Sequence, residues 1–131
     1  MISAPDHHPL RLVDSITELG PSDAGCVAVS GSHGGLSSAR YAVAARPWLS
    51  VFNDAGVGKD EAGIAGLGVL QQAGLAAIAV AHASARIGQA NSTLQEGTVS
   101  HLNEAAQALG FVSGKPLKAQ LASWIEWPAV D

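Results

Sequence analysis

Three polar, glycine-containing segments of this chain carry most of the side chains that could do chemistry. They are residues 30–35 (SGSHGG), 53–60 (NDAGVGKD) and 81–88 (AHASARIG), and each follows a short apolar run. If the three runs are parallel strands of one sheet, their carboxyl ends meet at one edge, where open α/β sheets bind ligands. The sequence therefore predicts a single pocket lined by all three segments.

The first segment has the composition of an anion-binding turn. Gly34 and Gly35 allow the backbone to turn tightly and expose its N–H groups, while Ser30 and Ser32 supply hydroxyl donors. A helix that begins after the turn adds the positive end of its dipole. The segment lacks the Gly-Lys-Ser/Thr of a P-loop and the G-x-G-x-x-G dinucleotide fingerprint. We expect it to bind a carboxylate or phosphate; the alternative is a tight turn without a ligand.

The second segment offers acid–base chemistry. Asp54, at a predicted strand end, could act as a general base or orient a histidine, and Asn53 could donate its amide to a substrate carbonyl. His33 of the first segment can titrate near neutral pH, so we predict that His33 and Asp54 form the catalytic pair. Lys59 is a candidate for binding a substrate anion, whereas Asp60 fits the N-cap of a helix.

The third segment contains Arg86, whose planar guanidinium can hold a carboxylate or phosphate with two hydrogen bonds. The alternative for Arg86 is an internal salt bridge, for example to Asp54. We also expect His82, Ser84 and the more distant His101 to contact the substrate. For the two histidines, a position in the core or at an interface is the alternative.

Several reaction classes can be compared on these residues. A Ser-His-Asp hydrolase lacks the Gly-x-Ser-x-Gly nucleophile elbow, and no H-x-H, H-E-x-x-H or cysteine pair supplies metal-ligand spacing. Acid–base chemistry without a metal or organic cofactor requires the fewest assumptions. We therefore predict a small hydrolase or isomerase/lyase for a carboxylate- or phosphate-bearing small molecule. The alternative is a non-catalytic binding module, or a small enzyme subunit, that binds an anionic metabolite.

Composition limits the class of protein. The chain has 131 residues, which suffices for one domain, and its charged fraction of 14% lies well below the roughly 25% of an average soluble domain. Sparse charge predicts a homo-oligomer. A net charge of -4 with seven Lys and Arg residues argues against nucleic acid, and no apolar run is long enough for a membrane span. One cysteine, Cys26, and no signal-peptide pattern predict a cytoplasmic protein in which this thiol is buried.

The elements that must position these residues alternate along the chain. We expect a flexible N-terminal arm at 1–9 and a single α/β domain at 10–131, with the tryptophan-bearing tail packed on the body or on a neighbouring subunit. Apolar runs and helical periodicity predict a small three-layer domain with a mostly parallel sheet of about three to five strands flanked by helices. The predicted strands are 26–30, 49–53 and 75–81, the predicted helices 37–46, 61–72 and 98–109, and 89–97 is a predicted polar loop; 11–19 fits either a strand or a short helix.

Overall fold

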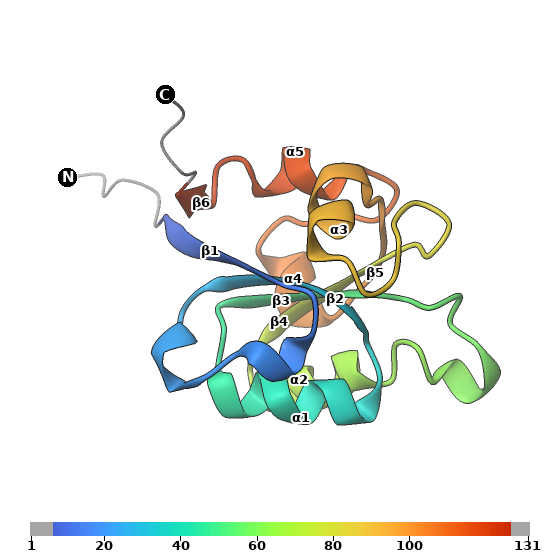
Figure 1. Ribbon diagram of the computed structural model, residues 1–131, viewed down its shortest axis with the longest axis horizontal. Coiled ribbons are helices and arrows are strands. Elements are labelled where there is room, and N and C mark those ends of the chain that lie inside the picture. The colour runs from blue at the N-terminus through green and yellow to red at the C-terminus, as the bar shows by residue number, and fades with distance from the viewer. Residues whose placement is uncertain (1–6, 127–131) are drawn as a thin grey trace.

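A six-stranded sheet forms the centre of the domain in a computed structural model that describes residues 7–126 (Figure 1). The strand order is β5-β4-β3-β2-β1-β6, and every neighbouring pair is parallel except β4 with β5. The mostly parallel α/β sheet predicted from the sequence is thereby confirmed. The strands are β1 His8–Val13, β2 Val27–His33, β3 Leu49–Asn53, β4 Ala76–Val80, β5 Val99–Leu102 and β6 Ile125–Glu126.

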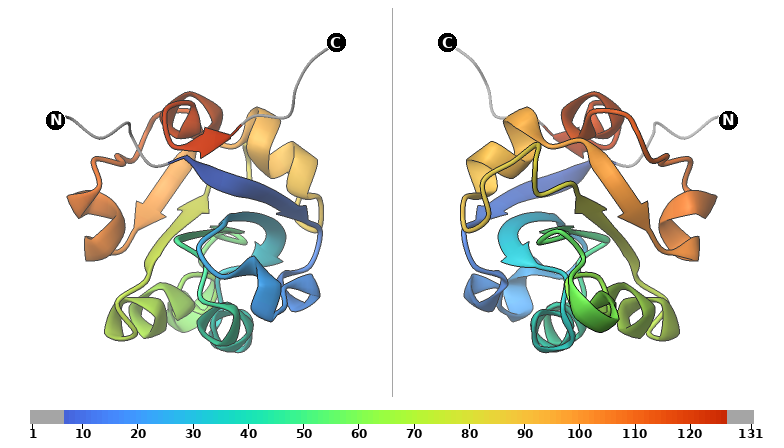
Figure 2. Two further views of the ribbon diagram at one scale, coloured as in Figure 1. Left: turned by 90° about the vertical axis from the view of Figure 1, so that its left-hand side faces the viewer. Right: turned by 90° about the vertical axis from the view of Figure 1, so that its right-hand side faces the viewer.

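Helices cover both faces of this sheet, which gives the expected three layers (Figure 2). Helices α1 (Leu36–Ala45) and α2 (Gly66–Gln72) lie on one face. Helices α3 (Ala90–Glu96), α4 (Glu104–Ala108) and α5 (Leu117–Leu121) lie on the other. Short 3-10 turns complete the fold: η1 Ile16–Glu18, η2 Pro21–Asp23 and η3 Lys59–Glu61.

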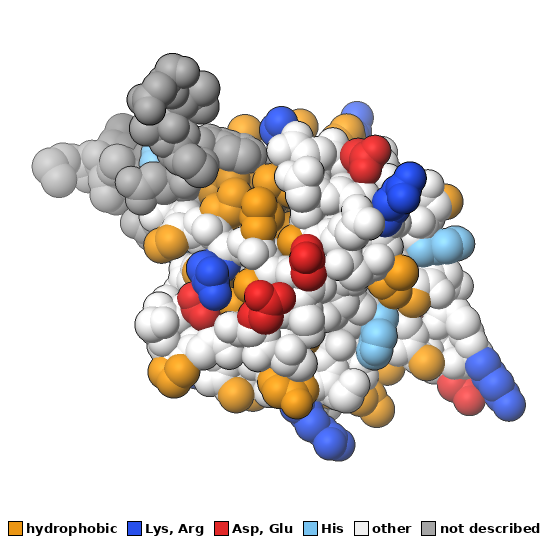
Figure 3. Space-filling view, in the orientation of Figure 1, with side chains coloured by type: hydrophobic (Ala, Val, Ile, Leu, Met, Phe, Trp, Pro, Cys, Tyr) orange, Lys and Arg blue, Asp and Glu red, His pale blue; other side chains and the backbone are white. Residues whose placement is uncertain are grey.

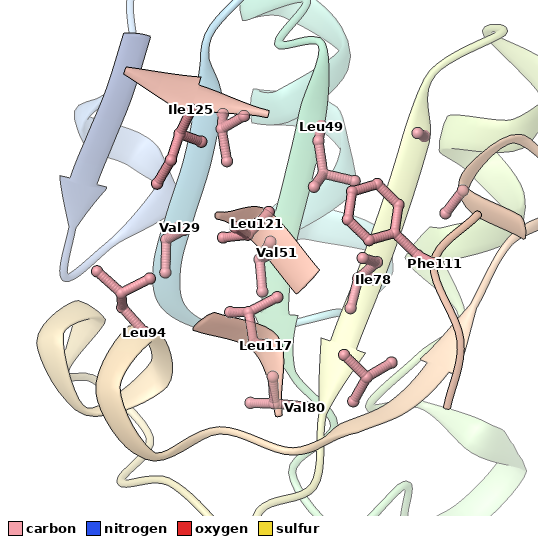
Figure 4. Packing of buried hydrophobic residues seen from close by; sticks show 14 of the residues in the cluster. Val29, Leu49, Val51, Ile78, Val80, Leu94, Phe111, Leu117, Leu121 and Ile125 are labelled. Carbon is pink, nitrogen blue, oxygen red and sulfur yellow. The ribbon is translucent and has the colours of Figure 1, made fainter. Parts of the chain in front are cut away.

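The core is divided by the sheet into two apolar layers. Because side chains alternate between the faces of a strand, Val29 and Val51 point to the α3–α5 layer, whereas Ala28 and Phe52 point to the α1–α2 layer. Figure 4 shows Leu117 and Leu121 of α5 packed over Val29, Val51 and their neighbours. Apolar residues on both faces explain why the central strands are continuous apolar runs in the sequence.

Cys26 lies just before β2 with 2% of its surface exposed. Its burial, followed by the negative charge of Asp23, raises the pKa of this thiol to about 11. The prediction of a buried structural cysteine is therefore confirmed.

The region 89–109 differs from its sequence-based interpretation. Residues 90–96, expected in a loop, form α3, because Ala90, Thr93 and Leu94 bury one face of an otherwise polar helix. Residues 98–109, expected to be one helix, form strand β5, then Asn103 and α4. The apolar spacing of 98–109 fits a helix. Residues 99–102 instead pair with β4 at the edge of the sheet, and this pairing holds them in an extended conformation.

The N-terminal part of the chain joins the sheet earlier than expected. His8 and Pro9, assigned to the arm from the sequence, pair with β6, and the His8 ring stacks on Trp48 with 3.9 Å between ring centroids. The ambiguous segment 11–19 contains both the end of β1 and the turn η1. At the other end of the chain, Trp124 packs against Trp48 at 4.9 Å, while Trp127 lies outside the described residues.

Candidate functional site

The carboxyl ends of β2, β3 and β4 lie at one edge of the sheet, so the three polar segments begin at the same edge, as expected from the sequence. His33 is in register with Asn53, and Asn53 with Val80. In the space-filling view of Figure 3, histidine side chains show toward this edge, while charged groups of both signs are scattered over the face. Within residues 7–126, two cavities open at this edge instead of the single pocket that was expected.

The larger cavity has a volume of about 710 Å³ and combines the second and third segments with α3. It lies on the α3 side of the sheet. Its lining residues are Asn53, Ala55, His82, Ala83, Ser84, Ala85, Arg86, Ile87, Gln89 and Glu96.

Asn53 is a buried residue in the lining of this cavity. Its side chain is fully buried; its amide nitrogen donates to the carbonyl of Ala85 over 3.2 Å, and its amide oxygen accepts from the N–H of Ala55 over 2.8 Å. The side chain therefore fixes the two loops relative to each other. Much of its hydrogen-bonding capacity is already used, so its structural contribution is larger than the sequence suggested.

Asp54 is a buried carboxylate with both oxygens hydrogen-bonded. Oδ1 accepts from the backbone N–H of Gly56 over 2.8 Å and from that of His82 over 3.0 Å. Oδ2 accepts from the hydroxyl of Ser100 over 2.7 Å. The side chain, which is 5% exposed, thus joins its own loop to two segments that are 28 and 46 residues away in the sequence.

The hydrogen bonds of Asp54 keep it ionised. Burial by itself raises the pKa of this carboxyl, but the Ser100 hydroxyl, the N–H groups of Gly56 and His82, and the nearby His101 together lower it below its usual value. Asp54 is consequently a carboxylate at neutral pH, and it stabilises a positive charge that develops next to it.

Two imidazoles flank Asp54. Nδ1 of His82 lies 3.7 Å from Oδ1, and Nδ1 of His101 lies 3.8 Å from Oδ2. His82 is 62% exposed and lines the larger cavity, whereas His101 is not among the residues that line it. The residue placed to reach a ligand in the cavity is therefore His82.

The Ser100 hydroxyl sets the tautomer of His101. Its single hydrogen is directed to Asp54 at 2.7 Å or to the carbonyl of Ala79 at 3.2 Å. Toward His101 Nδ1, 3.0 Å away, Ser100 can therefore only accept a hydrogen bond. Neutral His101 then carries its hydrogen on Nδ1. The hydrogen bonds thus run from His101 through Ser100 to the carboxylate of Asp54, which is next to His82.

Arg86 lines the same cavity from the loop after β4. Its backbone N–H donates to Ser92 Oγ over 2.9 Å, and the Ser92 hydroxyl donates to Glu96 Oε1 over 2.7 Å. In the described part of the chain its guanidinium forms no ion pair, so the alternative of a salt bridge to Asp54 is not what the structure has. The guanidinium is free to bind an anion.

The first segment forms a separate, smaller cavity of about 220 Å³ on the α1 side. Ser32 and His33 line it, and His33 Nδ1 accepts from the N–H of Gly35 over 3.1 Å. A register shift in β2 before His33 and this local hydrogen bond direct the imidazole away from β3. The expected pairing of His33 with Asp54 is thus corrected: His82 and His101 are the imidazoles near the carboxylate.

The remaining predicted site residues have mainly structural contacts. The buried hydroxyl of Ser30 donates to the carbonyl of Val51 over 2.7 Å. Ser84 Oγ donates to Ala81 and accepts from Thr98, and so joins the loop after β4 to the start of β5. Lys59 is exposed in η3, away from both cavities.

Asp60 is not the N-cap of a helix, contrary to expectation. It lies inside η3 with a left-handed φ of 55°, and α2 begins at Gly66 after a further turn. Several residues of the loop between β3 and α2 share this left-handed conformation, including Ala55 and Val57. The loop projects from the body at the lower right of Figure 1.

Ser100 and Glu96 are the residues of the larger site that the sequence reasoning missed. A helix over 98–109, which the sequence predicts, gives no reason to place the Ser100 hydroxyl beside Asp54. For Glu96 a signal was present: Ser92 precedes it by four residues, the spacing at which helical side chains meet. Glu96 could be recognised from this spacing only if residues 90–96 were predicted to form a helix.

Across residues 7–126, no group of three or more His, Cys, Asp and Glu side chains is arranged to hold a metal ion. None of the helices described is long and apolar enough to cross a membrane. Comparisons of the chain with protein-family models, with curated proteins and with solved structures found no match. Function is therefore inferred from the geometry of the site.

Proposed function

We propose that this protein is a small enzyme that acts on a carboxylate- or phosphate-bearing small molecule by acid–base chemistry in the larger cavity. The observation that carries the proposal is the position of Asp54. This buried, ionised carboxylate lies 3.7 Å from the imidazole of His82. His82 and Arg86 line the same cavity, and the Arg86 guanidinium forms no ion pair within residues 7–126. A carboxylate that supports an imidazole beside an anion-binding group is a recurrent arrangement for proton transfer.

Each residue has a distinct part in this proposal. Arg86 binds the substrate anion through its guanidinium. His82 takes or gives the proton at the reacting atom, and Asp54 stabilises the imidazolium that results. Ser100 and His101 act through Asp54 as positioning residues. Hydrolysis and isomerisation or elimination all need this proton transfer, so they remain the reaction classes under this proposal.

One observation favours a second candidate, the non-catalytic binding module. Both oxygens of Asp54 are hydrogen-bonded to the chain itself, and two of the donors are backbone N–H groups. In a binding module Asp54 would serve to fix the loops around Arg86, and ligand would bind without turnover.

The test replaces one histidine at a time. A panel of small carboxylates and phosphate esters is screened for turnover by NMR, and the substrate found is used with His82→Gln and His33→Gln. Loss of a general acid or base lowers kcat by about 10²–10⁴-fold, and we expect this for His82→Gln with little change in KM. His33→Gln, which alters the other cavity, is the matched control and should retain turnover.

Two results would contradict the enzyme. Equal turnover in His82→Gln and the unaltered protein removes the catalytic role of His82. Saturable binding of panel members without any turnover would mean that the protein is a binding module and not an enzyme.

Self-association, supported by the charged fraction of 14%, and a cytoplasmic location, supported by the single cysteine of the chain, are part of the same proposal. Static light scattering tests the first: a mass of 13.2 kDa at micromolar concentration means a monomer and contradicts it.

A further inference from the structure

We propose that the smaller cavity, between β2 and α1, is a second binding site that takes a phosphate group, either free phosphate or that of a phosphomonoester. The inference is independent of the proposed function, which uses the larger cavity. It rests on the donors in and beside this space, on the rigidity of the turn that holds them, and on one largely buried serine whose hydroxyl has no partner among residues 7–126.

The backbone donors come from the first turn of α1. This helix has ten residues, its N-cap is Gly35, and no side chain caps it. The first amide to enter the helical pattern is that of Ala39, which donates to the carbonyl of Gly35. The N–H groups of Leu36, Ser37 and Ser38 have no partner among residues 7–126, and no acidic residue occupies the turn to neutralise them.

Ser38 supplies the independent observation. It is 6% exposed and lines the cavity, yet its hydroxyl forms no hydrogen bond with any residue the structure describes. The residue is largely buried, but its oxygen is not sealed in the core, so the hydroxyl faces the cavity without a protein partner among the described residues. A ligand oxygen in the cavity would provide that partner.

Other side chains add donors around the same space. Ser32 Oγ accepts from the N–H of Ile16, which leaves its own hydrogen free. Nδ1 of His33 accepts from Gly35, so the neutral imidazole carries its hydrogen on Nε2. The hydroxyls of Ser37 and Tyr41 also line the cavity, and no described carboxylate does.

The turn that presents these donors is held on both sides. The N–H of Gly34 donates to the carbonyl of Asn53 in β3 over 3.1 Å, and the carbonyl of Gly34 accepts from Gly66 at the start of α2 over 2.8 Å. A Cβ at Gly35 would lie 2.7 Å from the His33 ring, and one at Gly66 would overlap the carbonyl of Gly35. Glycines at these positions let strand, turn and helix pack closely, so the donors are preorganised.

The chemistry of this donor set favours phosphate. Backbone N–H groups at a helix N-terminus combined with serine hydroxyls form a typical phosphate site, without any requirement for lysine or arginine. A tetrahedral oxyanion has enough oxygens to bind backbone amides and hydroxyls at the same time, whereas a carboxylate has two. The volume of about 220 Å³ leaves room for the phosphate group and a small part of its ester.

The test is a titration of the ¹⁵N-labelled protein with inorganic phosphate, followed by amide chemical shifts. We expect saturable shifts at Leu36, Ser37 and Ser38. Ser38→Ala removes one hydrogen bond and should weaken binding about fivefold. Ser37→Ala, at an exposed position, gives a second variant that cannot fail through loss of the core. Ser113→Ala, in a remote exposed turn, is the matched control and should not change the affinity.

Two further titrations distinguish free phosphate from a phosphomonoester, and binding in the smaller cavity from binding in the larger one. Glycerol 3-phosphate that binds at least as tightly as inorganic phosphate identifies a monoester site, while preference for inorganic phosphate identifies a site for the free ion. Arg86→Ala should leave the shifts unchanged. The proposal is overturned if the α1 amides show no saturable shift, if both Ser38→Ala and Ser37→Ala bind like the unaltered protein, if acetate binds equally well, or if Arg86→Ala abolishes the shifts.

Discussion

The Ser100 hydroxyl and the Asp54 carboxylate are joined by a 2.7 Å hydrogen bond although 46 residues separate them in the chain. The bond exists because β5 runs antiparallel to β4 at the edge of the sheet, which brings its residues back to the end of β3. A strand of four residues thus completes a site whose other parts come from the loops after β3 and β4.

Ser100→Ala should make the protein less stable in a pH-dependent way. The hydroxyl lowers the pKa of Asp54 below its unfolded value, so its contribution is present above that value, about 3.9, and is lost as the pH falls through the folded pKa. Hydrogen bonds to charged groups contribute about 1.5–3 kcal/mol. Urea denaturation should show a loss of this size near neutral pH and a smaller one at about pH 3.

Asp54→Asn should lower turnover while substrate binding is retained. The amide has nearly the shape of the carboxylate but no charge, so it cannot stabilise an imidazolium at His82, 3.7 Å away. We expect kcat to fall by at least about tenfold with KM changed less than threefold, the pattern of an interaction made in the transition state. Circular dichroism checks the fold, and an unchanged kcat would refute the role of the carboxylate.

Arg86→Ala should act on binding. Its guanidinium has no internal ion pair to lose within residues 7–126, so its removal should leave stability within about 0.5 kcal/mol, as at other surface positions. Binding of the anionic substrate should weaken by about 1.5–3 kcal/mol, the size of a charged hydrogen bond. Calorimetric titration measures this, with Arg40→Ala on the exposed side of α1 as the control. Equal affinity in the two variants would exclude Arg86 from the site.

The sequence allowed prediction of the features that local patterns determine. The apolar run that forms β3 lies between Pro47, which ends α1, and Asn53, and its predicted bounds of 49–53 match the structure. Asp54 could be selected as a candidate site residue because it directly follows that run. The edge of the sheet at which ligands are expected follows from the parallel strands alone.

The orientation of the histidines depends on contacts that no local pattern shows. Val99 and Leu102 are spaced for a helix or a short strand, and pairing with β4 determines the outcome, so the position of His101 beside Asp54 was not predictable. His33 turns away because β2 shifts register before it and because its ring accepts from Gly35. These are tertiary effects, and they determine which imidazoles lie beside Asp54.

Two glycine substitutions should have opposite effects on stability. A Cβ at Gly31, in β2, would overlap the backbone of Gly88 and Gln89, whose loop is held by the hydrogen bond from Gly88 N–H to Gly31. Gly31→Ala should therefore cost about 3 kcal/mol. Gly68 is exposed in α2 with no atom within 4 Å of its ideal Cβ, so Gly68→Ala should stabilise by about 0.5–1 kcal/mol. Thermal unfolding distinguishes them, and a shift of the same sign in both would contradict this packing.

Asn103→Asp should destabilise the fold more at neutral than at acid pH. Asn103 Oδ1 accepts from the N–H groups of Ala77 and Ala106, and its Nδ2 donates to the carbonyls of Leu67 and Leu75. A carboxylate keeps the two accepted bonds but places a second, negatively charged oxygen against two carbonyls in a buried position. We expect a loss of about 3 kcal/mol near neutral pH.

Protonation should recover part of this loss, because a neutral carboxyl introduced by Asn103→Asp can donate to one of the carbonyls. The folded pKa of the new carboxyl is then raised, so its stabilising effect is present below the unfolded value of about 3.9 and disappears as the pH rises. Urea denaturation at several pH values measures the difference from the unaltered protein. Asn91→Asp, on the exposed first turn of α3, is the matched control and should stay within about 0.5 kcal/mol at every pH. A loss in Asn103→Asp that does not depend on pH would mean that the amide nitrogen of Asn103 does not donate to these carbonyls.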